Sequence, residues 1–318
     1  MHRTIDIHTH GIGGFDTRSN SVDDILRIAE IHGSCGVAGI VLSIYSGPID
    51  VMRQHMEVVS RAIERQGQSR LIVRPGTEDR RPNSESTGSA GHPSPVTRHE
   101  PRAARILGIH LEGPFLNPLQ CGALDPASFV SPRESILDEL LEGFGPIVKV
   151  ITVAPEREGV VSVIKKAVEK SIVVSMGHSD ATYAEAEAGF RAGARAITHL
   201  FNAMRGFHHR EPGLAGFGLL NKEVYVEVIA DPFHLHPKTI ELIFKTKEPE
   251  RIILISDSVK ETKTAASDKG IASACGTLQG GSLALPDGCQ RLAAIGFDET
   301  IIANASTTNP RRYLGIRG

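Results

Sequence analysis

The sequence contains no long apolar run and few cysteines, and both features limit the kind of protein it encodes. No stretch approaches the roughly 18 apolar residues that span a bilayer, and the first residues, MHRTIDIHTHG, hold no apolar signal core. Four cysteines occur in 318 residues, without a CxxC pair, which favours a reduced protein over a disulfide-stabilised secreted one. We therefore expect a soluble, cytoplasmic protein with no membrane partner.

An excess of charge of one sign is also missing. The formal net charge is −2, from 35 Lys and Arg against 37 Asp and Glu. This balance argues against nucleic acid as a partner. A chain of this length buries a large core without needing a structural metal, and α/β barrels of roughly 250 residues fold as one unit. We predict a single domain over residues 1–318.

Short apolar runs alternate with longer amphipathic segments, which is typical of βα units around a parallel sheet. The predicted strands are Thr4–His8, Gly39–Tyr45, Arg105–Leu111, Ile147–Val153, Ile172–Met176, Ala196–Leu200, Val224–Ala230 and Arg251–Ser256. Predicted helices include Ser21–Ser34, Val160–Lys170, Thr182–Ala192 and Pro237–Lys245. This pattern predicts an α/β fold, a (β/α)8 barrel of the TIM type, although an open doubly wound sheet would share it.

Two helix starts carry a capping-box pattern, Ser21 with Asp24 and Thr182 with Glu185. One segment interrupts the alternation: Thr77–Ala104 is rich in Pro, Ser, Gly, Arg and Glu and has no apolar period. We expect a flexible insertion at 77–104, ahead of the third barrel strand. The apolar piece Leu71–Val73 before it could form an additional strand.

Polar residues stand at the carboxyl ends of the predicted strands, where the loops of a barrel form its active site. The first strand ends in His8-Thr9-His10, and residues two apart in an extended chain point the same way. Two imidazoles on one side can bind a divalent metal. An HxH pair alone is weak evidence, since chance pairs are common in a chain with many histidines.

Three further strand ends carry Glu112, His178 and His199. A buried carboxylate is costly unless it is paired or bound to a cation. A single histidine at a strand end is more often a structural residue, but several at one end of a barrel favour a His2Glu metal site with an open position for water.

The last predicted strand ends in Asp257. A lone aspartate there is usually a helix N-cap. Beside a metal, its carboxylate could accept a proton from water and return it to a leaving group, as amide hydrolysis requires.

Several motifs resemble those of N-acetylglucosamine-6-phosphate deacetylases, which are metal-dependent amidohydrolases, and they occur in that family's order. They are HTHGIGGFD, GIHLEGPFLNP, TVAPE, GHSDATY, THLFNAM, HHREPGLAG and ASTTNPRRYLG. The resemblance implies one or two divalent ions. Glu112, His178 and His199 would hold the principal ion and His8 and His10 a second, while Asp257 would activate water and protonate the departing amine.

The resemblance also implies how an amino-sugar phosphate binds. His234 would contact the substrate near the scissile carbonyl, and the backbone around Asn202 and Ala203, with Arg210, would bind the phosphate. Arg210 or His209 would reach in from a second subunit, which implies a homodimer. Without the resemblance, Arg210 would be interpreted as a surface residue and His234 as a capping residue.

The ligand types do not select one metal. Imidazole and carboxylate admit zinc, iron, manganese, cobalt or nickel, and we expect zinc.

Three departures from the family pattern raise alternatives. Leu124 stands where the family has a histidine that contacts the sugar, we expect the family's accessory β-sandwich to be missing, and we expect the last βα unit to be distorted around Asp287. The alternatives are an amidohydrolase acting on another N-acyl or cyclic amide, and a weakly active sugar-phosphate-binding paralogue.

Overall fold

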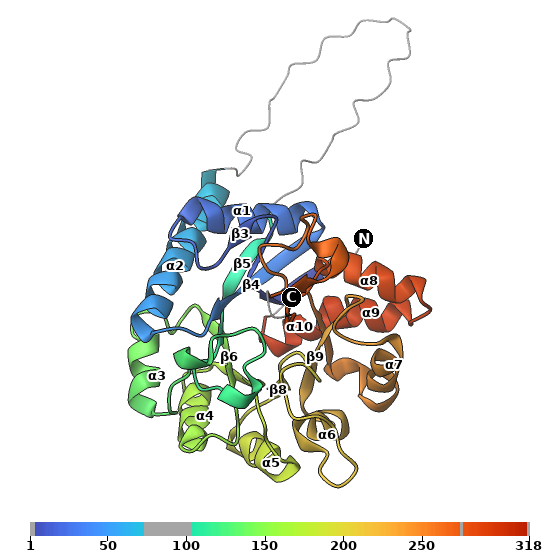
Figure 1. Cartoon of the computed structure of the whole chain (residues 1–318). Coiled ribbons are helices and arrows are strands. Elements are labelled where there is room, and N and C mark those ends of the chain that lie inside the picture. Colours follow the sequence, from blue (N-terminus) through green and yellow to red (C-terminus); the bar gives the residue numbers. More distant parts are fainter. Residues whose placement is uncertain (1–3, 73–102, 274–275, 317–318) are drawn as a thin grey trace, which may run out of the picture.

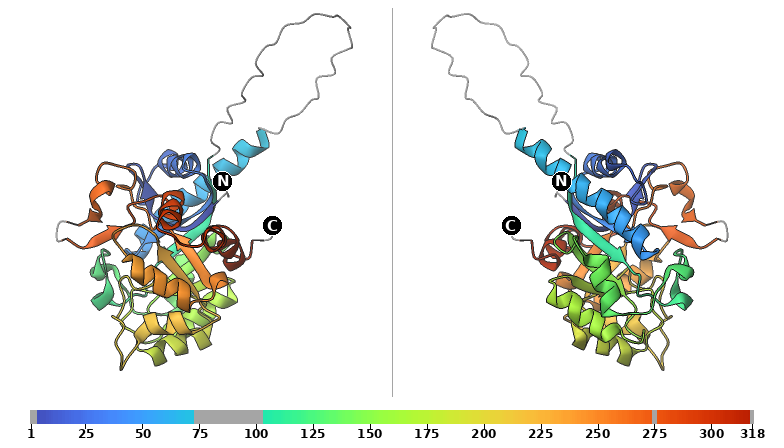
Figure 2. Two further views of the ribbon diagram at one scale, coloured as in Figure 1. Left: turned by 90° about the vertical axis from the view of Figure 1, so that its right-hand side faces the viewer. Right: turned by 90° about the vertical axis from the view of Figure 1, so that its left-hand side faces the viewer.

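Eight parallel strands form the centre of the molecule (Figures 1 and 2) in a computed structural model that describes residues 4–72, 103–273 and 276–316. The strands are β1 (Thr4–Thr9), β4 (Val37–Tyr45), β5 (Arg105–Glu112), β6 (Val148–Val153), β7 (Val173–Met176), β8 (Ala196–Ile197), β9 (Tyr225–Ile229) and β10 (Ile252–Ile255). They pair in sequence order, each parallel to the next.

The first and last strands lie beside each other and close the sheet. The Asp257 amide donates to the His8 carbonyl at 3.0 Å, and the His10 amide donates to the Ser258 carbonyl at 2.7 Å. A parallel bridge joins Thr9 to Ser258. The predicted barrel is therefore confirmed, and the open-sheet alternative is wrong.

Ten helices among the described residues surround the strands (Figure 1). They are α1 (Val22–Ser34), α2 (Ile49–Ile72), α3 (Glu134–Leu141), α4 (Val160–Glu169), α5 (Tyr183–Ala192), α6 (Gly213–Leu220), α7 (Pro237–Thr246), α8 (Leu285–Ala294), α9 (Glu299–Ser306) and α10 (Thr308–Tyr313). Short 3-10 turns occur at Pro118–Gln120, Pro126–Ser128, Pro249–Arg251 and Ser267–Lys269. None of these helices, within the described ranges, is long and apolar enough to cross a bilayer.

The two predicted capping boxes differ in outcome. Thr182 and Glu185 form the full reciprocal box at the start of α5. At α1 only half of the box forms: Ser21 accepts from the Asp24 amide, while the Asp24 carboxylate accepts from the Ser19 hydroxyl at 2.6 Å. The Ser21 amide, which a reciprocal box would pair with Asp24, donates to the Ser19 hydroxyl at 3.1 Å, so Ser19 bridges the two residues.

Other expectations need correction. Leu71 lies in the last turn of α2, so the additional strand is wrong there, and Val73 and the insertion up to residue 102 lie outside the described residues. Around Asp287 the chain forms the regular helix α8 rather than a distorted unit. Its Gly288 permits close packing, because a Cβ there would lie 3.1 Å from the Ala230 side chain.

The core has an inner and an outer part. Strand side chains and the encircling helices form the larger cluster, while a second cluster fills the barrel and includes Ile7, Tyr225 and Ile229 of the strands and Tyr313 of α10. The Asn309 side chain donates to the carbonyls of Pro249 and Ile252. Helix α10 therefore lies across the amino end of β10, opposite the active-site loops (Figure 2).

Two small antiparallel ribbons extend the loops at the carboxyl end of the barrel. The first joins β2 (Gly11–Ile12) to β3 (Phe15–Asp16) after β1, and the second joins β11 (Ile271–Ala272) to β12 (Leu278–Gly280) after β10.

Candidate active site

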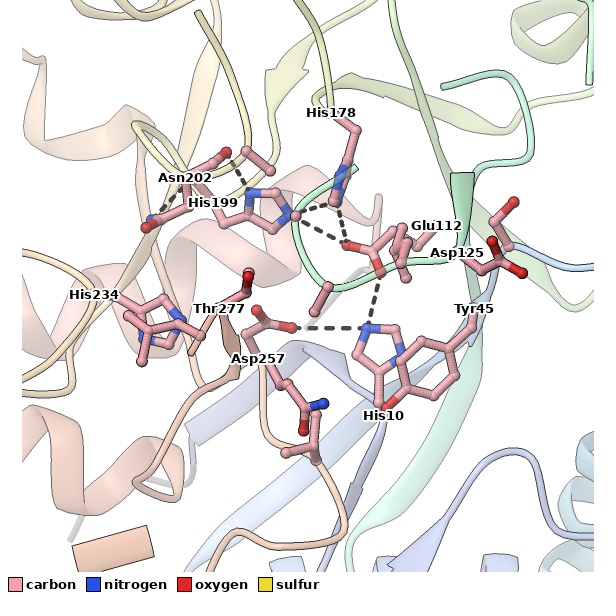
Figure 3. A pocket seen from close by; sticks show the side chains of 18 of the residues that line it. His10, Tyr45, Glu112, Asp125, His178, His199, Asn202, His234, Asp257 and Thr277 are labelled. Carbon is pink, nitrogen blue, oxygen red and sulfur yellow. Dashed lines mark hydrogen bonds and ion pairs between the residues drawn. The ribbon is translucent and has the colours of Figure 1, made fainter. Parts of the chain in front are cut away.

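A polar pocket of about 650 Å³ opens at the carboxyl ends of the strands, and most of the predicted site residues line it (Figure 3). Its walls include His10, Glu112, His178, His199, Asn202, Ala203, His234 and Asp257. His8 lies directly behind this wall and is completely buried. Strand ends that are far apart in the sequence therefore bring their polar side chains to one place.

Glu112, at the end of β5, is the centre of this cluster. Its Oε1 lies 3.1 Å from His178 Nε2 and 3.2 Å from His199 Nε2, and its Oε2 lies 3.1 Å from His10 Nε2. The Nε2 atoms of His178 and His199 are themselves 3.2 Å apart.

The other ring nitrogen of each histidine fixes its tautomer. His178 Nδ1 lies 2.9 Å from the Gln120 carbonyl, and His199 Nδ1 lies 3.1 Å from the Asn202 carbonyl. Because a carbonyl only accepts hydrogen bonds, each Nδ1 must carry the proton. Both Nε2 lone pairs then face the Glu112 carboxylate, an arrangement that is unfavourable unless a cation lies between them. The donor set therefore fits a divalent metal.

A second group of possible ligands adjoins the first. His8 Nε2 lies 3.3 Å from His10 Nε2 and 3.4 Å from Asp257 Oδ1. The His10 ring stacks on Tyr45 with 3.9 Å between ring centroids, which holds it in place. His8, His10 and Asp257 form one metal-compatible group, and Glu112 with His178 and His199 forms the other.

The electrostatics of the cluster favour positive charge. Burial alone would lower the pKa of His8, but the charge of Asp257 and hydrogen bonds to Glu112 and Glu227 raise it well above its ordinary value. Burial alone would raise the pKa of Glu112, but His10 and the neighbouring histidines lower it well below its ordinary value. A metal ion would be stabilised by the same carboxylate charges.

Three residues of the cluster adopt left-handed backbone conformations. The φ angles are 46° at His178, 30° at His199 and 48° at Asp257. This region costs a non-glycine residue about 1–2 kcal/mol and recurs at functional sites, where surrounding structure enforces it. The left-handed turn at His199 also explains why β8 ends at Ile197, short of the predicted Leu200.

His234 is oriented by a buried carboxylate. Its Nδ1 lies 3.0 Å from Asp231 Oδ2, and Asp231 also accepts from the backbone amides of Phe233 and Ser282. Burial opposes both charges, yet the pair lowers the pKa of Asp231 and raises that of His234. His234 Nε2 is thereby left available in the pocket that this ring lines.

The predicted phosphate ligands separate into two groups. Asn202 and Ala203 line the pocket, whereas His209 and Arg210 are exposed outside it and contact each other at 3.1 Å. Leu124 lines the pocket on the side of the β5 loop.

Two glutamates have roles that sequence reasoning missed. Glu227 is buried in β9 and lies 3.2 Å from His8 Nδ1. The sequence feature that could have identified Glu227 is a single acidic residue within an otherwise apolar strand, VYVEVIA. Such a residue is costly without a partner, which would have made it a candidate.

Glu156, in the TVAPE motif, connects loops around the pocket. Its carboxylate accepts from the Asn117 side chain at 2.8 Å, the Ser179 hydroxyl at 2.7 Å and the Asp180 amide at 2.7 Å. It therefore ties the loop after β5 to the loop that carries His178.

Comparison with known proteins agrees with this geometry. The amidohydrolase family matches residues 87–318. N-acetylglucosamine-6-phosphate deacetylase from Bacillus subtilis is 31% identical over 90% of this chain and 73% of its own length. N-acetylgalactosamine-6-phosphate deacetylase from Escherichia coli O157:H7 is 28% identical over 98% of this chain and 72% of its own.

Solved structures give the same result. A Mycobacterium smegmatis N-acetylglucosamine-6-phosphate deacetylase mutant, in complex with N-acetyl-D-glucosamine-6-phosphate, has a TM-score of 0.81 at 26% identity, covering 99% of this chain and 77% of that one. The Thermotoga maritima deacetylase has a TM-score of 0.80 at 26% identity, covering 99% and 79%. The chain belongs to the amidohydrolase family and, within it, to the N-acetylglucosamine-6-phosphate deacetylases.

Proposed function

We propose that this enzyme hydrolyses the acetamido bond of N-acetylglucosamine 6-phosphate, giving glucosamine 6-phosphate and acetate. The observation that carries the proposal is the convergence of Glu112, His178 and His199 beside Asp257 in a polar pocket. The similarity to named deacetylases supports the choice of substrate.

Glu112, His178 and His199 would hold the principal ion, with His8 and His10 holding a second. When bound, such an ion polarises the amide carbonyl and makes a water molecule more acidic. Zinc suits the imidazole and carboxylate donors, and iron, manganese, cobalt and nickel share that chemistry.

The protein's own residues would move the proton and orient the substrate. Asp257 accepts a proton from the attacking water and returns it to the departing amine nitrogen. His234, paired with Asp231, acts as an imidazolium and donates a hydrogen bond from Nε2 to the scissile carbonyl. The backbone around Asn202 and Ala203 binds the phosphate through the Ala203 amide, because the Asn202 amide donates to the His199 carbonyl.

We further propose a homodimer in which Arg210 or His209 of one subunit completes the phosphate site of the other. An apolar groove of about 500 Å³ lies between α6 and α7, and His234 lines both this groove and the pocket. Phe207, Leu220 and Leu242 line it with 55%, 59% and 50% of their surfaces exposed. Exposed apolar surface of this kind, together with the exposed pair His209 and Arg210, suits a second copy of the chain.

Mixing two inactive variants tests this arrangement. If Arg210 acts across the interface, subunits with Asp257→Asn and with Arg210→Ala should complement each other after dissociation and reassociation. Random mixing yields about half hybrid dimers, each with a single complete site, so about a quarter of the wild-type rate should return. No recovery in hybrids that form would contradict the shared site.

Release of acetate from N-acetylglucosamine 6-phosphate tests the function itself, with metal content measured on the same sample. Turnover should disappear on chelation and return with zinc or manganese. Equal activity on non-phosphorylated amides would overturn the proposed substrate and favour another N-acyl or cyclic amide, an alternative that the apolar Leu124 in the pocket motivates. Binding of sugar phosphate and metal without any hydrolysis would favour the paralogue instead.

We place the enzyme in the cytoplasm. The thiols of Cys35, Cys121 and Cys289 are all free, as a reducing compartment would keep them.

A further inference from the structure

Glu227 is a carboxylate in the interior of the barrel that the proposed chemistry does not use. It lies in the middle of β9 on the same face as Tyr225 and Ile229, which belong to the cluster filling the barrel. The residue has no exposed surface, and its Oε2 lies 3.2 Å from His8 Nδ1. Among the described residues, its Oε1 has no hydrogen-bond partner.

This contact sets the protonation of the His8 ring. A carboxylate accepts, so the proton of neutral His8 resides on Nδ1, and the Nε2 lone pair faces His10 and Asp257 at 3.3 and 3.4 Å. Carboxylates in this position orient metal-binding histidines and make the ring a better donor. We propose that Glu227 is the positioning residue for an ion held by His8, His10 and Asp257, an inference that rests on the proposed function.

The hydrogen bond from a carboxylate to a ligand histidine is specific to the half of the site formed by His8, His10 and Asp257. His178 and His199 are held by backbone carbonyls, which no substitution removes. His10 Nδ1 has no hydrogen-bond partner in the described part of the chain. Among these four histidines, His8 is therefore the one whose Nδ1 is held by a buried side-chain carboxylate, and the two halves of the site should respond differently to its loss.

Burial of Glu227 is difficult to explain by stability alone. A buried carboxylate with one unsatisfied oxygen costs free energy, but its removal alone also costs free energy because it leaves the buried His8 Nδ1 without its partner. Stability therefore falls in either role, and zinc affinity separates them: a positioning role weakens binding of the second ion, and a purely structural role does not.

The test uses Glu227→Met, Glu227→Gln and the control Asp6→Asn in the full chain. Asp6 is another fully buried carboxylate, and its Oδ1 accepts from the backbone amides of His8 and Ser256. Each protein is stripped of metal and titrated calorimetrically with zinc alone, and its thermal unfolding is followed in the metal-free state.

We expect Glu227→Met to bind the first ion normally and the second about 10–100-fold more weakly, with somewhat lower thermal stability because the buried His8 Nδ1 loses its partner. Glu227→Gln should recover most of that affinity, because its amide oxygen can still accept from Nδ1. Asp6→Asn should leave the second affinity unchanged.

The inference would be overturned if Asp6→Asn lost as much affinity for the second zinc ion as Glu227→Met does, or if Glu227→Met bound both ions equally more weakly. It would also be overturned if Glu227→Met were less stable but bound zinc normally, or if the wild-type protein took up a single ion. These readouts need no substrate. Failure to release acetate would therefore count against the proposed function alone, and the zinc titrations would still decide the role of Glu227.

Discussion

At the scale of single residues, Asp257 has both a structural role, through its backbone, and a proposed catalytic role, through its side chain. Its amide helps to close the barrel by donating to His8, and its carboxylate faces the pocket within 3.4 Å of His8 Nε2. The backbone role survives substitution of the side chain, whereas the proton-transfer role does not.

Asp257→Asn should therefore keep the fold and the ion held by Glu112 but lose turnover by roughly 10³-fold or more, because an amide cannot shuttle the proton. The measurements are acetate release at saturating substrate, metal content and circular dichroism on one preparation. A near-normal rate would show that another group moves the proton.

Leu124 bears on specificity rather than on chemistry. It lines the pocket beside Asp125, and its apolar side chain cannot form a hydrogen bond with a substrate hydroxyl. Leu124→His should lower the KM for N-acetylglucosamine 6-phosphate several-fold, with a smaller effect on kcat. Leu124→Met serves as the matched control, and an unchanged KM in the histidine variant would place the sugar elsewhere.

At the scale of elements, the loops at the carboxyl end depend on Glu156. It receives hydrogen bonds from Asn117, Ser179 and Asp180, which lie in two different loops. Charge-assisted hydrogen bonds of this kind contribute more than neutral ones.

Glu156→Ala should reduce kcat/KM about 10–100-fold, because the loop carrying His178 loses its attachment. Faster hydrogen exchange at Ser179 and Asp180 should accompany the loss. Glu158→Ala, an exposed neighbour, is the control. If both variants behave alike, the network does not position the loop.

How far the sequence predicts these elements depends on how local their signals are. Buried parallel strands are continuous apolar runs, so all eight positions could be predicted, and the box at Thr182 is encoded within four residues. The polar strand ends indicated the residues that the structure brings together. Glu227 was missed because its partner His8 is 219 residues away, and only the closed barrel brings them into contact.

At the scale of the whole molecule, buried titratable groups set the response to acid. His32 of α1 is completely buried with Nε2 3.0 Å from the Thr9 hydroxyl, and burial lowers its pKa from 6.5 to about 4. As the pH falls through this window, the unfolded chain takes up the proton first, so stability decreases with falling pH.

Between pH 7 and pH 5 this one histidine should cost about 2 kcal/mol of the unfolding free energy. His32→Gln, which does not titrate, should show a pH dependence shallower by that amount. Urea denaturation of both metal-free proteins at the two pH values measures the difference. Parallel curves would mean that His32 is protonated without unfolding.

The left-handed backbone at His178, His199 and Asp257 has a consequence for how such a chain would evolve. Glycine is the residue that these conformations favour, and it would relieve about 1–2 kcal/mol at each position while removing the functional side chain. A lineage released from selection for hydrolysis would gain stability by drifting toward glycine at these positions. Such a lineage should therefore be recognisable by glycine at one or more of these three positions.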